Sequence, residues 1–302
     1  EVYTDGDAAA VRRFQFRHGL AVTGDLDSFT VAEINTPVSR RVRQIELALE
    51  RLRWLPAIGR ERFIVVNIPA FQLFAFDSVG GNGAPALSMK VIVGKALDKQ
   101  TPVLYEQLRY VDFRPFWNVP RSILVEEVIP ALQKDSLYLR RNDMELVGAA
   151  DLVAEEPVTP EVIARLAAGD LRVRQRPGPG NALGLTKFVF PNAARVYLHG
   201  TPQPELFAHT RRDFSHGCVR VEDPAALAVW VLRDRPGWNR SRVEAAQRAA
   251  TTSRMMLARP IPVVIFYTTA VASPDGSAWF YSDIYGHDRA LDEALRAGPT
   301  PP

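Results

Sequence analysis

The spacing of apolar positions divides the chain into a helical beginning and a longer remainder that is rich in strands. Apolar residues recur at three- and four-residue steps within residues 8–35 and again within residues 40–54, a spacing that is typical of helices. In the first segment Gly19 is expected to end one helix and Asp27 to cap the next. The second segment is predicted to be an amphipathic helix with the stripe Val42, Ile45, Leu49 and Leu52.

After residue 60 the apolar positions alternate with polar ones or form short runs, as they do in strands. A glycine-rich turn is expected at residues 78–85. The spacing of these runs predicts a mostly antiparallel β domain. Its strands are expected at residues 63–68, 72–77, 87–93, 108–113, 195–199 and, as a long buried strand, 261–272.

The run of strands is interrupted between residues 122 and 185. Residues 122–141 are predicted to be helical with a break at Pro130, and Thr159 is expected to cap a helix that Gly169 ends. The Arg-Pro-Gly-Pro-Gly-Asn run at 176–181 is interpreted as a flexible loop, because no strand precedes it and no helix follows it as a phosphate-binding loop requires. This segment is therefore predicted to be a helix-rich insertion.

Composition excludes several classes of protein. The 302 residues are 47% apolar and 24% charged, so the chain is globular rather than disordered. The apolar run at 261–272 is too short to cross a bilayer, and residues 1–20 show no leader of basic and then apolar residues. The net charge of +3 is spread along the chain, so no nucleic-acid partner is expected.

The candidate chemistry gathers around one residue, because Cys218 is the only cysteine. Three of the five histidines, His199, His209 and His216, lie within twenty residues of it. A thiol nucleophile needs a cationic neighbour, a base and backbone N–H groups that face the developing oxyanion. Gly217 lets the backbone approach a substrate, and Arg220 supplies positive charge. Cys218 is therefore predicted to be a nucleophile rather than a buried core thiol.

The histidines receive different interpretations. His199 is the candidate base, whereas His216 is too close to Cys218 in sequence and is expected to shape the site. His209 is left open as a surface residue or a residue of the site rim. The three histidines and the cysteine are the right types for a zinc site, but their spacing is irregular, so neither a metal nor a cofactor is expected.

Two motifs carry a resemblance to a known family. His199-Gly200-Thr201, followed after a gap by the Ser-His-Gly-Cys-Val-Arg run at 215–220, resembles the signature of the L,D-transpeptidase, or YkuD, catalytic domain. Residues 11–34 resemble the latter part of a peptidoglycan-binding helical domain. Residues 117–120, the insertion and residues 190–192 resemble the large Gram-negative members, which carry a substrate-capping subdomain.

The resemblance implies a fold and a set of domains. The fold class is a mostly β catalytic domain, a sandwich or barrel of mixed strands, with a helix-rich capping insertion and a small N-terminal α-helical domain. The expected boundaries are a partial peptidoglycan-binding-like domain at 1–36, a linker helix at 37–60, the catalytic domain at 61–285 with the capping insertion at 122–185, and a C-terminal tail at 286–302.

It also implies a role for each residue of the two motifs. Cys218 would be the nucleophile, and His199 the base, oriented by the carbonyl of Gly200. Backbone groups of Gly217 and Cys218, with Tyr197 nearby, would form the oxyanion site. The residues expected to bind or shape the substrate are Ser215, His216, Arg220 and Thr201.

The implied enzyme is a cysteine acyltransferase of the bacterial cell wall. Its donors and acceptors would be tetrapeptide stems of peptidoglycan, joined by 3→3 cross-links through a thioester, with D-alanine leaving. Carbapenem β-lactams are the expected inhibitors and the periplasm the expected location. An L,D-carboxypeptidase or a hydrolase that releases wall proteins would share this scaffold, and a wall-binding module with a dead site is the rival from another class.

Overall fold

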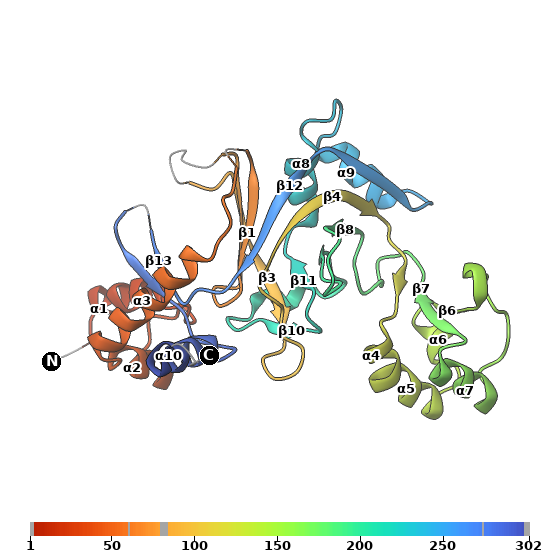
Figure 1. Cartoon of the computed structure of the whole chain (residues 1–302), viewed down its shortest axis with the longest axis horizontal. Coiled ribbons are helices and arrows are strands. Elements are labelled where there is room, and N and C mark those ends of the chain that lie inside the picture. Colours follow the sequence, from red (N-terminus) through yellow and green to blue (C-terminus); the bar gives the residue numbers. More distant parts are fainter. Residues whose placement is uncertain (1–2, 60, 79–83, 274, 299–302) are drawn as a thin grey trace.

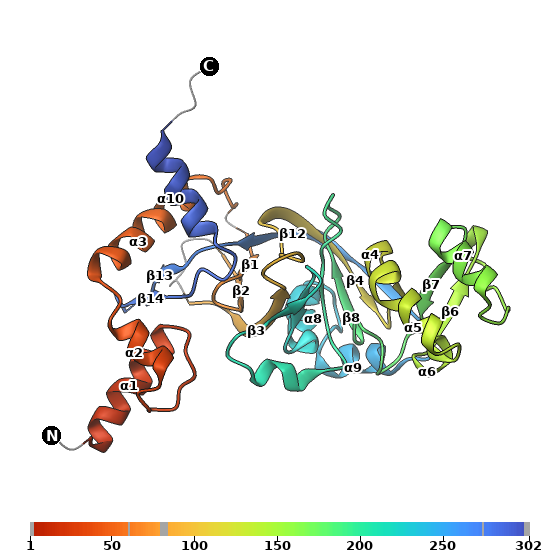
Figure 2. The ribbon, with the colours of Figure 1, turned by 90° about the horizontal axis from the view of Figure 1, so that it is seen from below.

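The computed structural model describes residues 3–59, 61–78, 84–273 and 275–298, so most of the turn expected at 78–85 lies outside the described residues. Figure 1 shows three parts in a row: an N-terminal helical part, a central curved sheet, and the insertion on the far side. Figure 2 shows the same order from below, with the last helix, α10 (His287–Ala297), beside α3 (Val38–Arg53).

The central sheet mixes parallel and antiparallel strands. Its order is β10-β3-β11-β9-β8-β4-β12-β1-β2, and a further pairing of β2 with β3 closes it on itself as a barrel. Parallel pairs join β1 to β12, β9 to β11 and β3 to β10, and the other pairs are antiparallel. The strands are β1 (Phe63–Asn67), β2 (Gln72–Phe76), β3 (Leu87–Gly94), β4 (Leu104–Phe113), β8 (Thr186–Val189), β9 (Leu198–His199), β10 (Asp213–Ser215), β11 (Val219–Val221) and β12 (Ser253–Phe266).

This architecture confirms the predicted fold class, while three predicted strands differ in their bounds. The strand expected at 108–113 begins four residues earlier, at Leu104. The strand expected at 195–199 is reduced to β9, since Arg195 has a positive φ of 56° that takes it out of the ladder. The strand expected at 261–272 starts earlier, at Ser253, and ends at Phe266. Residues 270–272 form β13 (Ala270–Ala272), which pairs with β14 (Ala278–Phe280) in a separate hairpin.

The main hydrophobic core lies between the apolar face of the sheet and two helices. Helix α8 (Pro224–Leu232) begins after Asp223, whose carboxylate accepts the N–H of Ala226 at 2.8 Å. Helix α9 (Arg240–Arg248) packs beside it and contributes the fully buried Val243. The core positions of β4, β8 and β9 alternate with polar ones, so one face of these strands is apolar and the other is available for chemistry.

The insertion has its own core and is not purely helical. Three short strands, β5 (Trp117–Asn118), β6 (Met144–Val147) and β7 (Arg172–Gln175), form a sheet that sequence reasoning missed. The helices are α4 (Arg121–Ile123), the π-helical turn η1 (Leu124–Val128), α5 (Ile129–Lys134), α6 (Tyr138–Arg141), the 3₁₀ turn η2 (Ala149–Asp151) and α7 (Pro160–Ala168). Helix α7 confirms the predicted Thr159 cap and Gly169 end.

The predicted break at Pro130 is wrong. The chain stays helical from Arg121 to Lys134, and it ends at Asp135, which is extended. The π-helical turn η1 lies directly before Pro130, which stands in the first turn of α5, where its missing N–H costs least. The loop at 176–181 is fixed to its surroundings, since the buried Asn181 amide donates to the carbonyl of Pro115 at 3.2 Å and to that of Arg176 at 2.9 Å.

The N-terminal part contains α1 (Asp5–Arg17), α2 (Ser28–Ile34) and α3 (Val38–Arg53). The predicted cap at Asp27 is present, since its carboxylate accepts the Thr30 N–H at 2.7 Å. Helix α3 does not bury its apolar stripe. Instead Leu47, Ala48 and Arg51 face the protein, while the stripe positions, Val42, Ile45, Leu49 and Leu52, are exposed.

The segment predicted as a C-terminal tail begins with helix α10 (His287–Ala297), which packs against α3. A buried ion pair joins the Arg51 guanidinium of α3 to the Asp288 carboxylate of α10, and Thr269 donates a hydrogen bond to the same carboxylate. Both charged side chains are nearly inaccessible to solvent. This pair therefore joins α3 of the N-terminal part to α10.

Replacing Asp288 with alanine is expected to destabilise this part strongly, because Arg51 would keep its charge in a buried site without a partner. The loss in the free energy of unfolding should be about 3–5 kcal/mol, measured by urea denaturation. Glu61→Ala, which removes the exposed ion pair with Arg259, is the control and should change little. Equal stability of the two variants would contradict the assignment.

Candidate active site

A row of polar side chains crosses the sheet on the face opposite the core. Strand register places Asp112 beside Arg254, Lys187 beside Asp112, His199 beside Lys187, and Arg220 beside His199. Because side chains alternate between faces, these five residues share one face of the sheet, and their neighbours Val111, Phe188, Leu198 and Val219 face the core. The candidate base therefore lies between two cations, Lys187 and Arg220.

Cys218 lies on this face, one step before the row. It directly precedes β11, two residues from Arg220, and so shares its side of the strand. By the same register it lies opposite Tyr197, whose carbonyl accepts the N–H of Val219 at 3.2 Å. The Cys218 side chain is half-buried, with its Sγ 3.9 Å from the carbonyl oxygen of Arg195. The parallel pairing of β9 and β11 thus brings the two sequence motifs together.

The backbone around Cys218 is held by the loop itself. The buried Ser215 hydroxyl donates to the Cys218 carbonyl at 2.5 Å and accepts the Gly217 N–H at 3.1 Å. Gly217 has a φ of 109°, which favours glycine and bends the chain back before β11. Ser215 uses its hydroxyl within the loop, so it shapes the site through the backbone.

His199 is buried and its tautomer follows from its hydrogen bond. Its Nδ1 lies 2.6 Å from the carbonyl oxygen of Gly200, so this nitrogen carries the proton and Nε2 keeps its lone pair. Burial, with the charge of Arg220 as the second cause, lowers the pKa of His199 to about 3. The imidazole is therefore neutral across the physiological range and can accept a proton.

The pKa of the Cys218 thiol is subject to opposing effects. Burial raises its pKa, while hydrogen bonds from Tyr197 and the charges of Lys187 and Arg220 oppose that rise. Burial also raises the pKa of Tyr197, so its phenol stays protonated and can donate a hydrogen bond. The Lys187 ammonium lies 3.9 Å from the centre of the Tyr197 ring, within range of a cation–π contact. At neutral pH the site therefore holds a protonated thiol beside a neutral base.

One polar contact connects the insertion to the loop of residues 215–218, the catalytic loop, and a second connects it to the segment that follows β3. The Nε2 of His216 lies 2.6 Å from the Glu127 carboxylate, and Lys99 donates to Glu126 at 2.7 Å. Both glutamates belong to the π-helical turn η1. The π-helical turn η1, which directly precedes Pro130, thus supplies two adjacent carboxylates, and one of them contacts His216, two residues from Cys218.

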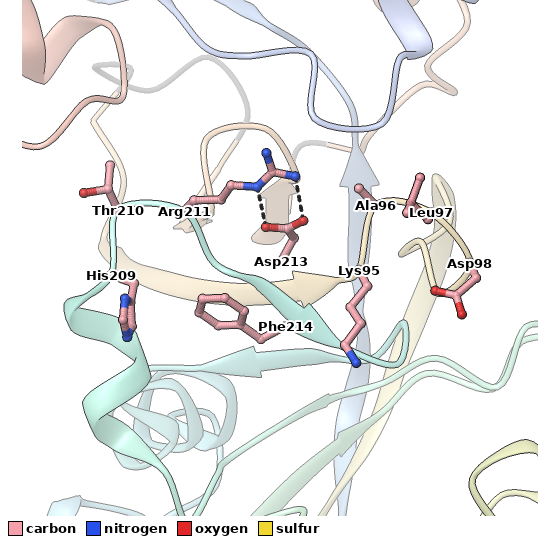
Figure 3. Close-up of a pocket in the computed structure, with 9 residues that line it drawn as sticks. All are labelled: Lys95, Ala96, Leu97, Asp98, His209, Thr210, Arg211, Asp213 and Phe214. Atoms are coloured by element: carbon pink, nitrogen blue, oxygen red, sulfur yellow. Dashed lines mark hydrogen bonds and ion pairs between the residues drawn. The ribbon is translucent and has the colours of Figure 1, made fainter. Parts of the chain in front are cut away.

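The remaining predicted residues lie at the edges of the site. The Thr201 hydroxyl accepts the N–H of Gln203 at 3.2 Å, and Arg220 donates to the Gln203 side chain at 3.3 Å. His209 is exposed and contacts Phe214 edge to face. His209 and Phe214 line a separate hollow of about 630 Å³. Figure 3 shows these two side chains with Lys95 and the ion pair of Arg211 with Asp213.

Sequence reasoning missed the polar partners that come from elsewhere in the chain, above all Lys187 and Glu127. The sequence pattern could have identified Lys187, because the apolar Phe188 and Phe190 alternate with it as in a strand, which places the lysine on the opposite face. No sequence pattern could have identified Glu127, since only the folded insertion brings it to His216.

In the described part of the chain no group of three or more His, Cys, Asp and Glu residues is arranged to hold a metal ion. The histidines near Cys218 are instead engaged by Gly200, Glu127 and Phe214. Among the described helices, none has the length and apolar character needed to cross a membrane.

Comparisons with known proteins identify the family of this chain. Residues 61–265 match the model of the YkuD family, described as the L,D-transpeptidase catalytic domain. A putative L,D-transpeptidase of Haemophilus influenzae is 31% identical over 256 residues, which are 85% of this chain and half of that protein. A crystal structure of an L,D-transpeptidase from Stackebrandtia nassauensis is 14% identical, with 87% of this chain and 78% of that one covered and a TM-score of 0.31. The family model spans more than half of the chain, which therefore belongs to the YkuD family of L,D-transpeptidase enzymes.

Proposed function

We propose that this protein is a cysteine acyltransferase that forms 3→3 cross-links between tetrapeptide stems of peptidoglycan. One observation carries the proposal: the only thiol of the chain lies one step along the sheet from a neutral, buried imidazole whose Nδ1 is held by the Gly200 carbonyl, on the same face. The chain spans half the length of its Haemophilus relative, so its substrates are inferred from the family and the site.

In the proposed acylation, His199 takes the thiol proton as the sulfur of Cys218 attacks the carbonyl of the third residue of the donor stem, a diamino acid. The oxyanion accepts hydrogen bonds from the backbone N–H of Cys218 and from Tyr197, and Gly200 keeps the imidazole oriented. The C–N bond to D-alanine then breaks, and the proton passes from His199 to the leaving amine. A thioester remains on Cys218.

In the second step an amine resolves the thioester. The side-chain amine of another stem's diamino acid attacks the thioester carbon, a new amide bond forms, and the C–S bond breaks. The amine proton returns through His199 to the sulfur. Because His216 and Arg220 lie two residues before and after Cys218 and Thr201 follows the base motif, these three side chains would shape the place where the stems bind.

The insertion would act as a capping subdomain over this site. Its support is the contact of Glu127 with His216 of the catalytic loop and that of Glu126 with Lys99, which follows β3. Such a cover excludes water, which matters because an amine must react with the thioester before hydrolysis does. Residues 1–36 would be the remainder of a peptidoglycan-binding domain. The substrate is external to the inner membrane, so the enzyme would work in the periplasm.

The test is mass analysis of muropeptides after incubation of the purified protein with disaccharide tetrapeptides. The expected product is a dimer that has lost one D-alanine. A tripeptide monomer alone would identify an L,D-carboxypeptidase, and release of a wall-bound protein would identify a hydrolase of that kind. Unchanged tetrapeptide, together with an unreactive Cys218, would point to a wall-binding module.

A carbapenem should acylate Cys218, because its strained β-lactam carbonyl takes the place of the stem carbonyl. Intact-mass spectrometry is expected to show one adduct on the wild-type protein. The matched control is Cys218→Ala, which should remain unmodified. A wild-type protein that stays free of adduct under excess drug would refute this prediction.

A further inference from the structure

We infer that Thr101, supported by Tyr285, is a positioning residue that turns the backbone N–H of Cys218 towards the oxyanion. The inference rests on the proposed acylation chemistry and goes beyond it, because Thr101 lies outside both sequence motifs and Tyr285 lies outside the residues that the family model matches. It concerns the hydrogen bonds that orient the peptide bond between Gly217 and Cys218 from the interior of the protein.

Thr101 is completely buried and its hydroxyl makes two hydrogen bonds. It donates to the carbonyl oxygen of Gly217 at 2.8 Å and accepts the N–H of Gly94 at 2.8 Å. A hydroxyl has one proton to donate, so the Gly94 N–H fixes the direction in which that proton points. The Gly217 carbonyl is therefore held by a donor whose own orientation is fixed.

This contact determines where the next N–H points. The peptide bond between Gly217 and Cys218 is planar and trans, so its carbonyl and its N–H point in opposite directions. With the carbonyl turned to Thr101 in the interior, the Cys218 N–H points away from that interior. Within the described residues this N–H has no hydrogen-bond acceptor, so it is available to a ligand.

Tyr285 supports Thr101 from the C-terminal side. Its phenol accepts the Thr101 N–H at 3.2 Å and donates to the Gly94 carbonyl at 2.6 Å. Its own N–H donates to the Tyr267 hydroxyl at 3.0 Å. The segment that follows the sheet is thereby joined, through Thr101, to the peptide bond before Cys218.

Close packing leaves Thr101 little freedom to move. A Cβ atom on Gly94 would lie 1.8 Å from the Lys99 carbonyl and 2.8 Å from the Thr101 nitrogen, so the backbone of residues 99–101 crosses directly over β3. The Ser215 hydroxyl holds the Gly217 N–H and the Cys218 carbonyl on either side of the same peptide. Rotation of that peptide is thus opposed by Ser215 and directed by Thr101.

The test compares two reactions of the same sulfur. Acylation by p-nitrophenyl acetate passes through an oxyanion, whereas alkylation by iodoacetamide does not. Thr101→Val keeps the shape and removes the hydroxyl, so it should slow acylation about 10- to 100-fold and leave alkylation within about twofold of wild type. Thr101→Ser restores the hydroxyl and should recover acylation to within about threefold.

Either of two results would overturn the inference: unchanged acylation in Thr101→Val, or equal loss of acylation and alkylation. If Thr101→Val does not fold, Tyr285→Phe serves instead, because it keeps both hydrogen bonds of the Thr101 hydroxyl and removes only their support. It should lower acylation relative to alkylation by a smaller factor, and an unchanged ratio would refute the inference. Neither reagent is a wall fragment, so failure of the proposed function on muropeptides would be seen separately.

Discussion

Replacing Cys218 with alanine is expected to abolish thioester formation and cross-linking, with a loss of at least about 10⁴-fold in the rate of dimer formation. The physical reason is that the chain contains no second thiol to carry the acyl group. The measurement is the muropeptide assay combined with intact-mass spectrometry of the protein. Because Cys218 is the only cysteine, a thioester adduct is assigned to it without peptide mapping.

The matched control is Cys218→Ser, which keeps the loop and the hydrogen-bonding capacity but supplies a much weaker nucleophile. It should bind substrate and form little or no acyl-enzyme. Cross-linking at the wild-type rate in Cys218→Ala would show that the mechanism proposed here is wrong. Loss of folding in both variants is not expected, since the side chain is half-buried and lies outside the core.

Replacing His199 with glutamine should slow acylation of Cys218 at neutral pH by about 10²- to 10⁴-fold, the usual contribution of a general base. The side chain amide fills the buried site but cannot take the thiol proton. The measurement is the rate of thioester formation with p-nitrophenyl acetate, followed by intact mass. Tyr197 and Lys187 remain in place, so the loss isolates the imidazole.

The pH profile gives this prediction a second readout. Burial lowers the pKa of His199 to about 3, so the imidazole stays unprotonated as the pH falls from 7 to 5 and wild-type acylation should stay level. In His199→Gln the reaction depends on free thiolate, and burial raises the pKa of Cys218. Its rate should therefore fall about tenfold per pH unit. A wild-type midpoint near 6.5 would contradict the assignment.

The secondary structure shows what local signals can and cannot determine. The Thr159 and Asp223 caps and the Gly169 end were predictable because each depends on hydrogen bonds within a few residues. The break predicted at Pro130 failed because a π-helical turn accommodates the proline. The strands of the insertion were missed because each has only a few residues and gains its pairing from a distant partner.

Helix α3 shows that local sequence patterns also fail to predict which face of a helix is buried. Its sequence has one continuous apolar stripe, yet the structure buries a different face, including the charged Arg51. An ion pair with Asp288, more than two hundred residues away, compensates that burial, and no local pattern could reveal it. The segment predicted as a C-terminal tail is a packed helix for the same reason, because its partner is the distant helix α3.

The sequence alone determined the chemical identity of the site: one thiol, a nearby histidine, and a glycine beside the thiol that lets the backbone approach a substrate. Those properties reside in single side chains and short spacings, which the chain order already contains. The tertiary structure alone decided the state of these groups. Parallel pairing of β9 with β11 brings the two motifs together, and burial keeps the imidazole neutral. Lys187, Glu127 and Thr101 belong to other strands, helices and loops, and only the fold places them near the site. Electrostatic and hydrogen-bonding environments depend on distances in space, and distance along the chain does not specify them.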